Sequence, residues 1–297
     1  MSTFFCSDLA RSENDQLFGT VKQIRLFIAL EYWPSWNSKA VQSDLLPVEV
    51  RQFLSGIKQQ FPQSRILLIR QRESKDRKPS CFIAIPDGPN SVVYRQQLDC
   101  YEDVLSLPFL ELAAGKAALP RLDAPMFLVC NHGKHDKCCA KYGGPVLTGN
   151  SSEHLWESSH LGGCRFAANM LCLPSGLVFG RVTPEDGARV IREHEAGLLD
   201  LSNFRGRANY SKPAQAAEYF VRREFAIRGI DQLTLRTQTQ QNETSWTTVF
   251  ENESTLYEVE HTVSKSATPR IVACADTEPE FVWSNHLTAI RTTLRST

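Results

Sequence analysis

A dense cluster of cysteines and histidines in the middle of the chain most constrains its fold. Residues 130–172 hold five of the nine cysteines and four of the seven histidines in a chain of 297 residues. They are Cys130, Cys138, Cys139, Cys164 and Cys172, with His132, His135, His154 and His160. Disulfides are rare in cytosolic proteins, so clustered thiols indicate metal binding or redox chemistry. The cluster therefore predicts a fold that carries soft ligands to one place.

Composition narrows the class of protein. Hydrophobic residues make up 42% and charged residues 22%, so a packed globular core is expected. Lys plus Arg and Asp plus Glu both number 33, and this zero net charge argues against nucleic-acid binding. No apolar run approaches the roughly 18 residues of a membrane span, and residues 1–15 are too charged for a signal peptide. We therefore expect a cytoplasmic protein without a membrane partner.

Residues 1–119 are predicted to form an N-terminal α/β domain, because strand-like and helical patterns alternate along them. Residues 48–61 place apolar side chains at helical spacing between Pro47 and Pro62. The charged run 71–79 is predicted to be a loop. The predicted strands lie at residues 21–33, 65–70, 81–85 and 92–98.

Residues 120–200 are predicted to form a second unit around the cysteine cluster. An apolar strand at 126–130 leads into a Cys/His-rich loop, and a hairpin follows at 169–182. A helix should begin at Pro184, because Thr183 before it is a suitable N-cap.

Residues 201–297 are predicted to form a C-terminal extension of helix and strands. Helical spacing runs from 213 to 228 and ends at Gly229. The polar run 237–245 is predicted to be an exposed loop. Strand-like runs are found at 246–250, 256–263 and 270–273.

Two short motifs in the cluster offer ligands to a metal. The first is Cys130 followed by the vicinal pair Cys138 and Cys139, either of which can be the second ligand. The second is His160 and Cys164, whose short Gly-Gly spacer lets both reach one centre from the same side. Four ligands in two pairs suit a tetrahedral zinc ion or a [2Fe–2S] cluster with two ligands per iron.

The remaining cysteines and histidines are predicted to have structural roles. Free cysteine is among the most buried residue types, so the other cysteines should be small hydrophobic core residues. These are Cys6, Cys81, Cys100, Cys172 and Cys274. His132 and His135 are expected to hydrogen-bond a sulfur or a carboxylate rather than to ligate. His154 is expected to be a packed or surface histidine.

The sequence around these motifs resembles the sucrase/ferredoxin-like family. The resemblance is carried by CNHGKHDKCCAKYGGPV from Cys130 and by SSHLGGCRFAANMLCLPSGLVFGRVTPEDGARVI from Ser158. The N-terminal Cys6-Ser-Asp and the run Gln16-Leu-Phe-Gly-Thr20 are also similar to the family. The resemblance implies that residues 120–200 form a thioredoxin-like [2Fe–2S] ferredoxin domain, packed with the N-terminal α/β domain and the C-terminal extension.

The resemblance also implies a ligand set. The family has a cysteine and a second cysteine about nine positions on, which Cys130 and Cys139 match, with Cys138 as the alternative. Its second pair is commonly two histidines separated by three residues in a Gly-Gly loop, whereas this chain has His160 and then Cys164. The implied set is three cysteines and one histidine.

The leading functional hypothesis is an electron carrier that passes single electrons between redox protein partners, rather than an enzyme. The alternative is a structural Cys3His zinc site in a non-enzymatic interaction protein. Thiol redox catalysis is disfavoured because the vicinal cysteines lack Cys-x-x-Cys spacing. No motif singles out the carboxylate pair of a sugar hydrolase. No Gly-rich phosphate loop follows a strand, and Gly143-Gly144-Pro145 is predicted to be a turn, so no nucleotide is expected.

Overall fold

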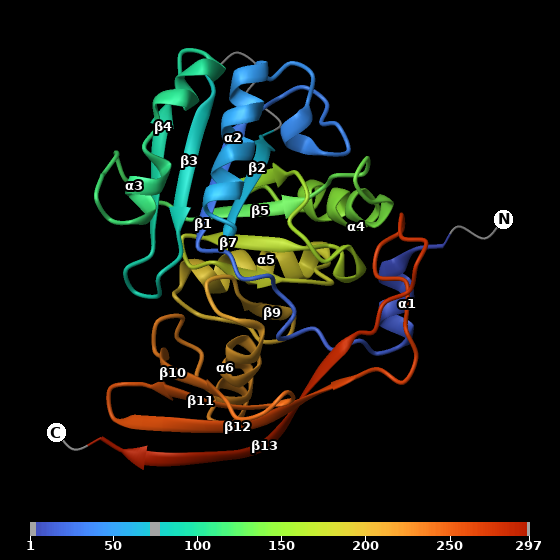
Figure 1. Ribbon diagram of the computed structural model, residues 1–297, viewed down its shortest axis with the longest axis vertical. Coiled ribbons are helices and arrows are strands. Elements are labelled where there is room, and N and C mark those ends of the chain that lie inside the picture. The colour runs from blue at the N-terminus through green and yellow to red at the C-terminus, as the bar shows by residue number, and fades with distance from the viewer. Residues whose placement is uncertain (1–3, 72–77, 296–297) are drawn as a thin grey trace.

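The computed structural model describes residues 4–71 and 78–295, and it has an α+β fold with two sheets (Figure 1). One sheet has nine strands and the other has four. This confirms the predicted class of fold, in which helices and β-strands are combined (α/β or α+β). Most of the loop predicted at 71–79 lies outside the described residues.

The nine-stranded sheet is mixed. Its strands are β1 (Leu26–Glu31), β2 (Ser64–Arg70), β3 (Ser80–Ile85), β4 (Val92–Gln97), β5 (Met126–Cys130), β6 (Leu155–Ser158), β7 (Met170–Leu173), β8 (Leu177–Phe179) and β9 (Phe204–Arg207). Their order is β4-β3-β1-β2-β6-β5-β7-β8-β9. The pairs β1–β2 and β5–β6 are parallel, and the other pairs are antiparallel. Parallel pairs align the carboxyl ends of their strands, which matters for the site below.

The two halves of this sheet share one core. They join where β2 pairs with β6 over a register of two residue pairs. In Figure 1, β1 to β3 run upright while β5 and β7 run across the view. Phe27 and Ile69 of the first half pack in the same cluster as Met126 and Leu171 of the second. The predicted join near residue 119 therefore lies between strands with a common core, and the division at 119 and 200 into separate domains stays a prediction.

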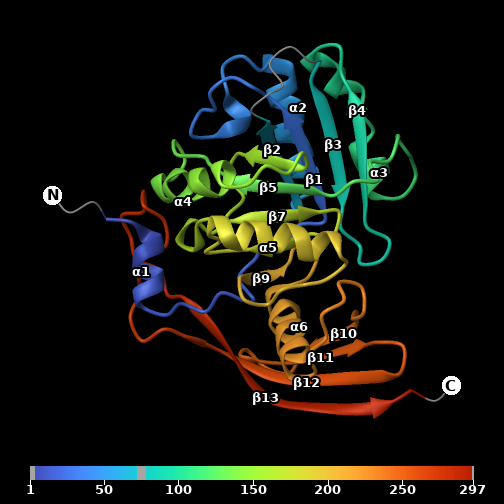
Figure 2. The same ribbon diagram turned by 180° about the vertical axis from the view of Figure 1, so that it is seen from behind.

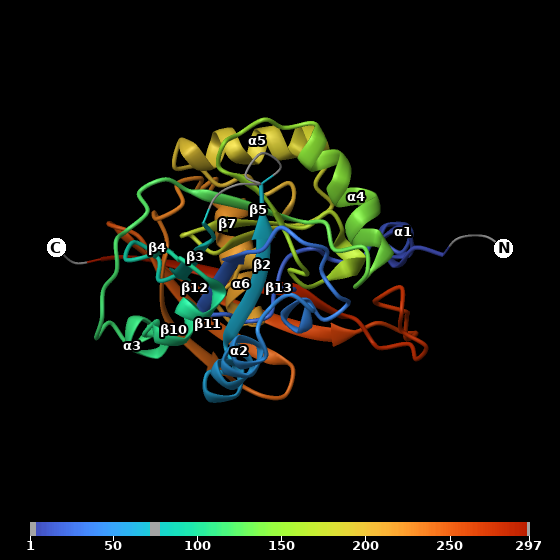
Figure 3. The ribbon, with the colours of Figure 1, turned by 90° about the horizontal axis from the view of Figure 1, so that it is seen from above.

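Helices cover the sheet on both faces. They are α1 (Cys6–Ser12), α2 (Val48–Gln60), α3 (Phe109–Ala113), α4 (Lys137–Thr148), α5 (Pro184–Glu195) and α6 (Lys212–Glu224), with 3-10 turns η1 (Ala40–Gln42), η2 (Tyr101–Ser106) and η3 (Cys164–Phe166). Leu54 of α2 packs in one core with β1 to β3, and Val190 and Ile191 of α5 pack against β5, β7 and β8. Figures 2 and 3 show α5 lying along β7 and α4 continuing toward α1.

Helix α5 begins as the sequence predicts. Thr183 Oγ1 accepts a hydrogen bond from the Asp186 amide, and the Asp186 carboxylate accepts one from the Thr183 amide. This reciprocal capping box satisfies two amides that the first helical turn leaves without partners. The local signal and the tertiary packing agree at this helix.

The C-terminal part adds a four-stranded antiparallel sheet. Its strands are β10 (Thr234–Gln240), β11 (Ser245–Glu251), β12 (Thr255–Lys265) and β13 (Trp283–Leu294). Helix α6 lies between this sheet and the larger one, and Phe220 of α6 packs with Phe250 and Val259 (Figure 1).

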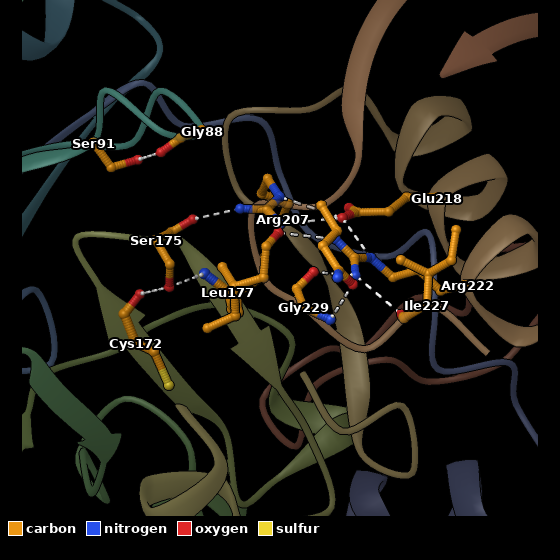
Figure 4. Close-up of polar contacts among 12 residues, drawn as sticks. Gly88, Ser91, Cys172, Ser175, Leu177, Arg207, Glu218, Arg222, Ile227 and Gly229 are labelled. Atoms are coloured by element: carbon orange, nitrogen blue, oxygen red, sulfur yellow. Dashed lines mark hydrogen bonds and ion pairs between the residues drawn. The ribbon is translucent and has the colours of Figure 1, made fainter. Parts of the chain in front are cut away.

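A buried ion-pair network joins α6 to β9 (Figure 4). Glu218 Oε1 accepts from Arg207 Nη2 at 3.2 Å and from Arg222 Nε at 3.0 Å. Both guanidinium groups also donate to the Ile230 carbonyl, at 2.8 and 2.9 Å. Buried charges are tolerated only when they are paired and hydrogen-bonded. This network therefore fixes α6 against β9, the edge strand of the larger sheet.

Four local predictions were wrong. The loop after residue 130 contains α4, so Gly143-Gly144-Pro145 is helical rather than a turn. The run 237–245 begins inside β10, and 270–273 is irregular apart from an isolated bridge at Arg270. Helix α6 ends at Glu224 instead of residue 228, because Ala226 adopts the left-handed conformation at φ 52°.

Candidate metal centre

The parallel pair β5–β6 brings the two predicted ligand motifs together. Cys130 is the last residue of β5 and lies in register with Ser158, the last residue of β6. The Asn131 amide donates to the Ser158 carbonyl at 3.1 Å just beyond the strands. The loop that carries His160 therefore starts beside Cys130, at the carboxyl edge where parallel strands commonly place ligands.

Helix α4 delivers the vicinal cysteines to the same edge. Asp136 is its N-cap, and its carboxylate accepts from the Cys138 amide at 2.8 Å. Gly143 allows the helix to pack directly on the end of β5, because a Cβ there would lie 2.0 Å from the Cys130 carbonyl oxygen. Cys138 and Cys139 occupy the first turn, where consecutive side chains point about 100° apart. They consequently enter different environments.

The loop between His160 and Cys164 depends on its two glycines. Gly162 and Gly163 have φ angles of 98° and 76°, in the left-handed region that side chains disfavour. A Cβ on Gly163 would also lie 2.4 Å from Arg205 Nη2. This tight turn leads into η3, so that His160 and Cys164 face the same centre.

These elements bring four predicted donors together, and we call this group the first site. It consists of Cys130, Cys139, His160 and Cys164. Cys139 Sγ lies 3.9 Å from Cys164 Sγ and 3.9 Å from His160 Nδ1, and Cys164 Sγ lies 3.7 Å from the same nitrogen. The ligand atoms of Cys130, Cys139 and His160 also lie within 4.8 Å of one another. The three cysteines are at most 5% exposed, whereas His160 is half-buried toward the surface.

Two more histidines lie beside the first site. The His135 ring stacks on the His160 ring, with centroids 3.8 Å apart, and His135 forms a ligand-sized group with His160 and Cys164. His135 Nδ1 also contacts the Ser38 carbonyl at 3.1 Å. His132 is buried, and its Nε2 contacts the Asn37 carbonyl at 2.8 Å. His135 is therefore placed to hydrogen-bond the Cys164 sulfur, as predicted, and also to replace His160 as a donor. His132 meets a backbone carbonyl instead, so its predicted hydrogen bond to a sulfur or a carboxylate was wrong.

The electrostatics of the first site favour negatively charged thiolates beside a positively charged His160 imidazole. A hydrogen bond from Cys139 lowers the pKa of Cys164 to about 5, against the effect of burial, with further help from His135 and His160. Cys139 likewise holds the pKa of Cys130 well below its ordinary value. Burial lowers the pKa of His160, but Cys130 and Cys164 outweigh it and raise that pKa to about 9. Thiolate is the form of cysteine that binds metals.

Basic side chains line the opposite side of the His160–Cys164 loop. Arg65 Nη1 donates to the His160 carbonyl at 3.1 Å, and Arg205 Nη1 donates to the Gly162 carbonyl at 3.1 Å. Both line a cavity of about 220 Å³ together with Lys22 and Lys212. This lining holds four cations and no acidic residue, so it puts positive charge on that side of the loop. On the other side, the buried carboxylate of Asp136 lies at ligand spacing from Cys139 and Cys164.

The remaining cysteines divide into three kinds. Cys81 and Cys172 are buried in the core, as predicted. Cys100 is exposed, so the prediction that it is a core residue was wrong. Cys6 and Cys274 meet Cys138 and Asp136 in a second group of ligand-sized spacing. Sequence reasoning missed that group, because its members are far apart in the chain.

A comparison with protein-family models decides the relationship. The model of the family described as sucrase/ferredoxin-like matches residues 17–206, more than half of the chain. The chain belongs to the sucrase/ferredoxin-like family. The first site lies wholly inside the matched residues, together with Arg65 and Arg205.

A comparison with curated proteins finds one relative of this chain. It is 32% identical over 102 residues to "Altered inheritance of mitochondria protein 32" of Candida glabrata, a match that covers 28% of this chain. The match spans about a third (32%) of the length of that curated relative. No solved structure matches. Among the described residues, no helix has the length and apolar character needed to cross a membrane.

Proposed function

We propose that this protein is an electron carrier that binds a [2Fe–2S] cluster at the first site, on a thioredoxin-like ferredoxin domain. The observation that carries the proposal is the meeting of three cysteine sulfurs and one imidazole nitrogen at the edge of a family-matched sheet. Cys130, Cys139, Cys164 and His160 would be the ligands. When bound, the cluster would supply a one-electron redox couple.

The chain's own residues fit an anionic inorganic group. The three thiols are buried, so water is excluded from the donor atoms. The Leu161 amide donates to Cys130 Sγ, a bond that stabilises negative charge on sulfur. Arg65 and Arg205 add positive charge behind the loop, which favours a state with one more electron. Hydrogen bonds to sulfur and nearby charge are the means by which proteins tune such potentials.

His160 defines the side from which partners would approach. Its Nδ1 faces the sulfurs, and it is the most exposed of the four donors. His135, which is exposed, stacks against it. The two imidazoles therefore form the thinnest cover over the first site, and we propose that redox protein partners dock there.

A structural Cys3His zinc ion is the alternative, and one observation favours it. Zinc–sulfur bonds of ~2.3 Å place two ligands of one tetrahedral ion about 3.6 to 3.8 Å apart. Cys139, His160 and Cys164 are separated by 3.7 to 3.9 Å, which suits a single ion. A zinc ion at the first site would hold α4 and the His160 loop together without redox chemistry.

Anaerobic purification tests the two functions. The electron carrier should be red-brown, contain iron and acid-labile sulfide in equal amounts, and give an electron paramagnetic resonance signal after reduction. Cys164→Ser should lose the colour, whereas Cys100→Ser, at an exposed position outside both groups, should retain it. Colourless wild-type protein whose bound zinc is lost in Cys164→Ser would establish the alternative.

A further inference from the structure

We propose that the chain holds a zinc ion at a second site, formed by Cys6, Cys138, Cys274 and Asp136. These residues lie on α1, the first turn of α4, the irregular segment before β13 and the N-cap of α4. Figure 1 shows α1 beside that irregular segment, and a hydrogen bond from the Cys6 amide to Cys274 Sγ at 3.4 Å links them. Cys6 and Cys274 lie outside the family-matched residues 17–206.

The spacing of the second site is that of one tetrahedral ion. The three sulfurs form a nearly regular triangle with separations of 3.3 Å (Cys138 to Cys274), 3.6 Å (Cys6 to Cys138) and 3.6 Å (Cys6 to Cys274). Asp136 Oδ2 lies 3.9 Å from Cys6 Sγ. Two sulfurs on one zinc ion should lie about 3.8 Å apart, and a sulfur and an oxygen about 3.6 Å apart. All four atoms therefore need only small shifts to surround an ion.

Backbone contacts hold the donors in place. Asp136 accepts from the Cys138 amide at 2.8 Å and from the Cys274 amide at 2.7 Å, one bond to each oxygen. Each carboxylate oxygen has a further lone pair, so these bonds orient the group without using all its acceptor capacity. The Ser7 amide also donates to Cys138 Sγ. Such outer hydrogen bonds orient metal ligands and are part of a built site.

A metal accounts for this arrangement better than a disulfide. A disulfide joins two sulfurs at about 2.05 Å and leaves any third thiol without a bonded partner. Here three sulfurs are equally spaced, and a carboxylate closes the fourth side. Three thiolates select soft or borderline ions, and zinc takes sulfur and oxygen donors in tetrahedral sites.

The second site would fasten α1 and the segment before β13 to the start of α4, beside the first site. Cys6 and Cys274 are 268 residues apart, and both contact Cys138, the neighbour of the first-site ligand Cys139. Closing so long a loop costs chain entropy, which a bound ion can offset. Zinc there would hold α1, the Cys274 segment and the start of α4 as one unit.

Metal analysis of matched variants tests this proposal. The wild-type chain, purified and then equilibrated with zinc and desalted, should retain one zinc that is absent from Cys274→Ser. Cys274 is only partly buried in an irregular segment, so its substitution leaves the core intact. Cys130→Ser should lose the first-site metal but keep this zinc, and Cys100→Ser should keep both. This pattern separates a failure at the second site from a failure of the proposed function.

Cobalt and a milder variant sharpen the test. Cobalt in place of zinc should give intense thiolate-to-metal bands that disappear in Cys6→Ser. Asp136→Asn keeps an oxygen for the Cys138 amide but removes the charged ligand. Loss of an outer partner alone costs 10–100-fold in metal affinity, so zinc should bind at least about 100-fold more weakly. A zinc content in Cys274→Ser equal to that of the wild-type chain, or a Cys138–Cys274 disulfide in zinc-free native protein, would overturn the proposal.

Discussion

The two cysteine groups share a helical turn but are built in opposite ways. The first site draws all its donors from residues 130–164, at the carboxyl edge of β5 and β6. The second group gathers Cys6 and Cys274 from opposite ends of the chain around Cys138. Adjacent positions of α4 thus belong to two different groups of donors, because consecutive helical side chains point in different directions. The first site depends on the sheet, and the second group depends on how α1 and the segment before β13 pack against α4.

The surroundings of the two groups also differ. Arg65 and Arg205 lie behind the first site, and a half-buried histidine covers its open side. The carboxylate of Asp136, already fixed by two amides, is a member of the second group, although it also lies at ligand spacing from Cys139 and Cys164. Positive surroundings suit a centre that gains an electron, whereas an added anionic ligand suits a divalent ion of fixed charge. The difference in surroundings is therefore consistent with the two proposed roles, a redox centre at the first site and a structural one at the second.

The largest expected effect comes from exchanging the vicinal cysteines for serine one at a time. Cys139→Ser should abolish iron binding and leave zinc at the second site, because only Cys139 faces Cys164 and His160. Cys138→Ser should do the reverse, because Cys138 faces Cys6 and Cys274. Iron and zinc content per chain measure both outcomes. If Cys138→Ser lost the iron and Cys139→Ser kept it, the assignment of the two sites would be wrong.

A second large effect concerns the ends of the chain. Zinc that binds only the closed form should slow amide exchange of α1 by a factor near 1 + [Zn]/Kd, or roughly a thousandfold at 1,000 times Kd. The amides of β5 should change far less, since they are held by the sheet. Hydrogen exchange followed by mass spectrometry, with and without zinc, measures both segments. Equal protection of α1 with and without zinc would show that the second site does not fasten the helix.

The contrast also explains what could be predicted from the sequence. The first site was found because its donors are close in sequence and the Gly-Gly spacer indicates a tight loop between two of them. The second was missed because Cys6 and Cys274 each look like an isolated cysteine, and nothing local places them 3.6 Å apart. A contact between residues 268 positions apart depends on how the whole chain folds back on itself, and local residue patterns do not reveal that path.

Local structure divides in the same way. Helix α5 was predicted because Thr183, Pro184 and Asp186 together form a complete start signal. Helix α4 was missed because Gly143, Gly144 and Pro145 are poor helix formers. Tertiary packing overrides that preference, since a side chain at position 143 would collide with the Cys130 carbonyl. The glycine that argued against a helix is what lets the helix reach the first site.

A smaller effect is expected on the reduction potential of the cluster proposed at the first site. One imidazole among three thiolates should place the potential between the roughly −400 mV of all-Cys ferredoxins and the roughly −150 mV at the lower end of two-His centres. His160→Cys adds a negative ligand, so the potential should fall by on the order of 100 mV toward the all-Cys value. The wild-type potential should fall as pH rises, because reduction raises the pKa of the outer imidazole nitrogen of a ligating His160 and so couples to proton uptake. His160→Cys should lose this dependence together with the imidazole.

The matched control for this potential lies at the second site. Cys274→Ser should leave the potential nearly unchanged, since Cys274 contacts Cys138 and Cys6 but none of the proposed first-site ligands. Redox titration at several pH values measures all three proteins. A wild-type potential that is flat with pH would argue against His160 as the ligand and in favour of His135, which stacks on it.

The smallest expected effect is a difference in thiol ionisation between the two sites in metal-free protein. A hydrogen bond from Cys139 lowers the pKa of Cys164 to about 5, and one from Cys6 lowers the pKa of Cys138 to about 7. Burial raises the pKa of Cys274 to about 12, so that thiol stays protonated. The pKa of Cys130 is also held well below its ordinary value, so Cys130 should ionise in the acidic range together with Cys164. Ultraviolet thiolate absorbance should therefore rise with pH first in that range and again near 7. Cys164→Ser should diminish the lower rise, to which Cys130 also contributes, and Cys138→Ser should remove the upper one. A single step near the ordinary cysteine pKa of about 8.5 would contradict both assignments.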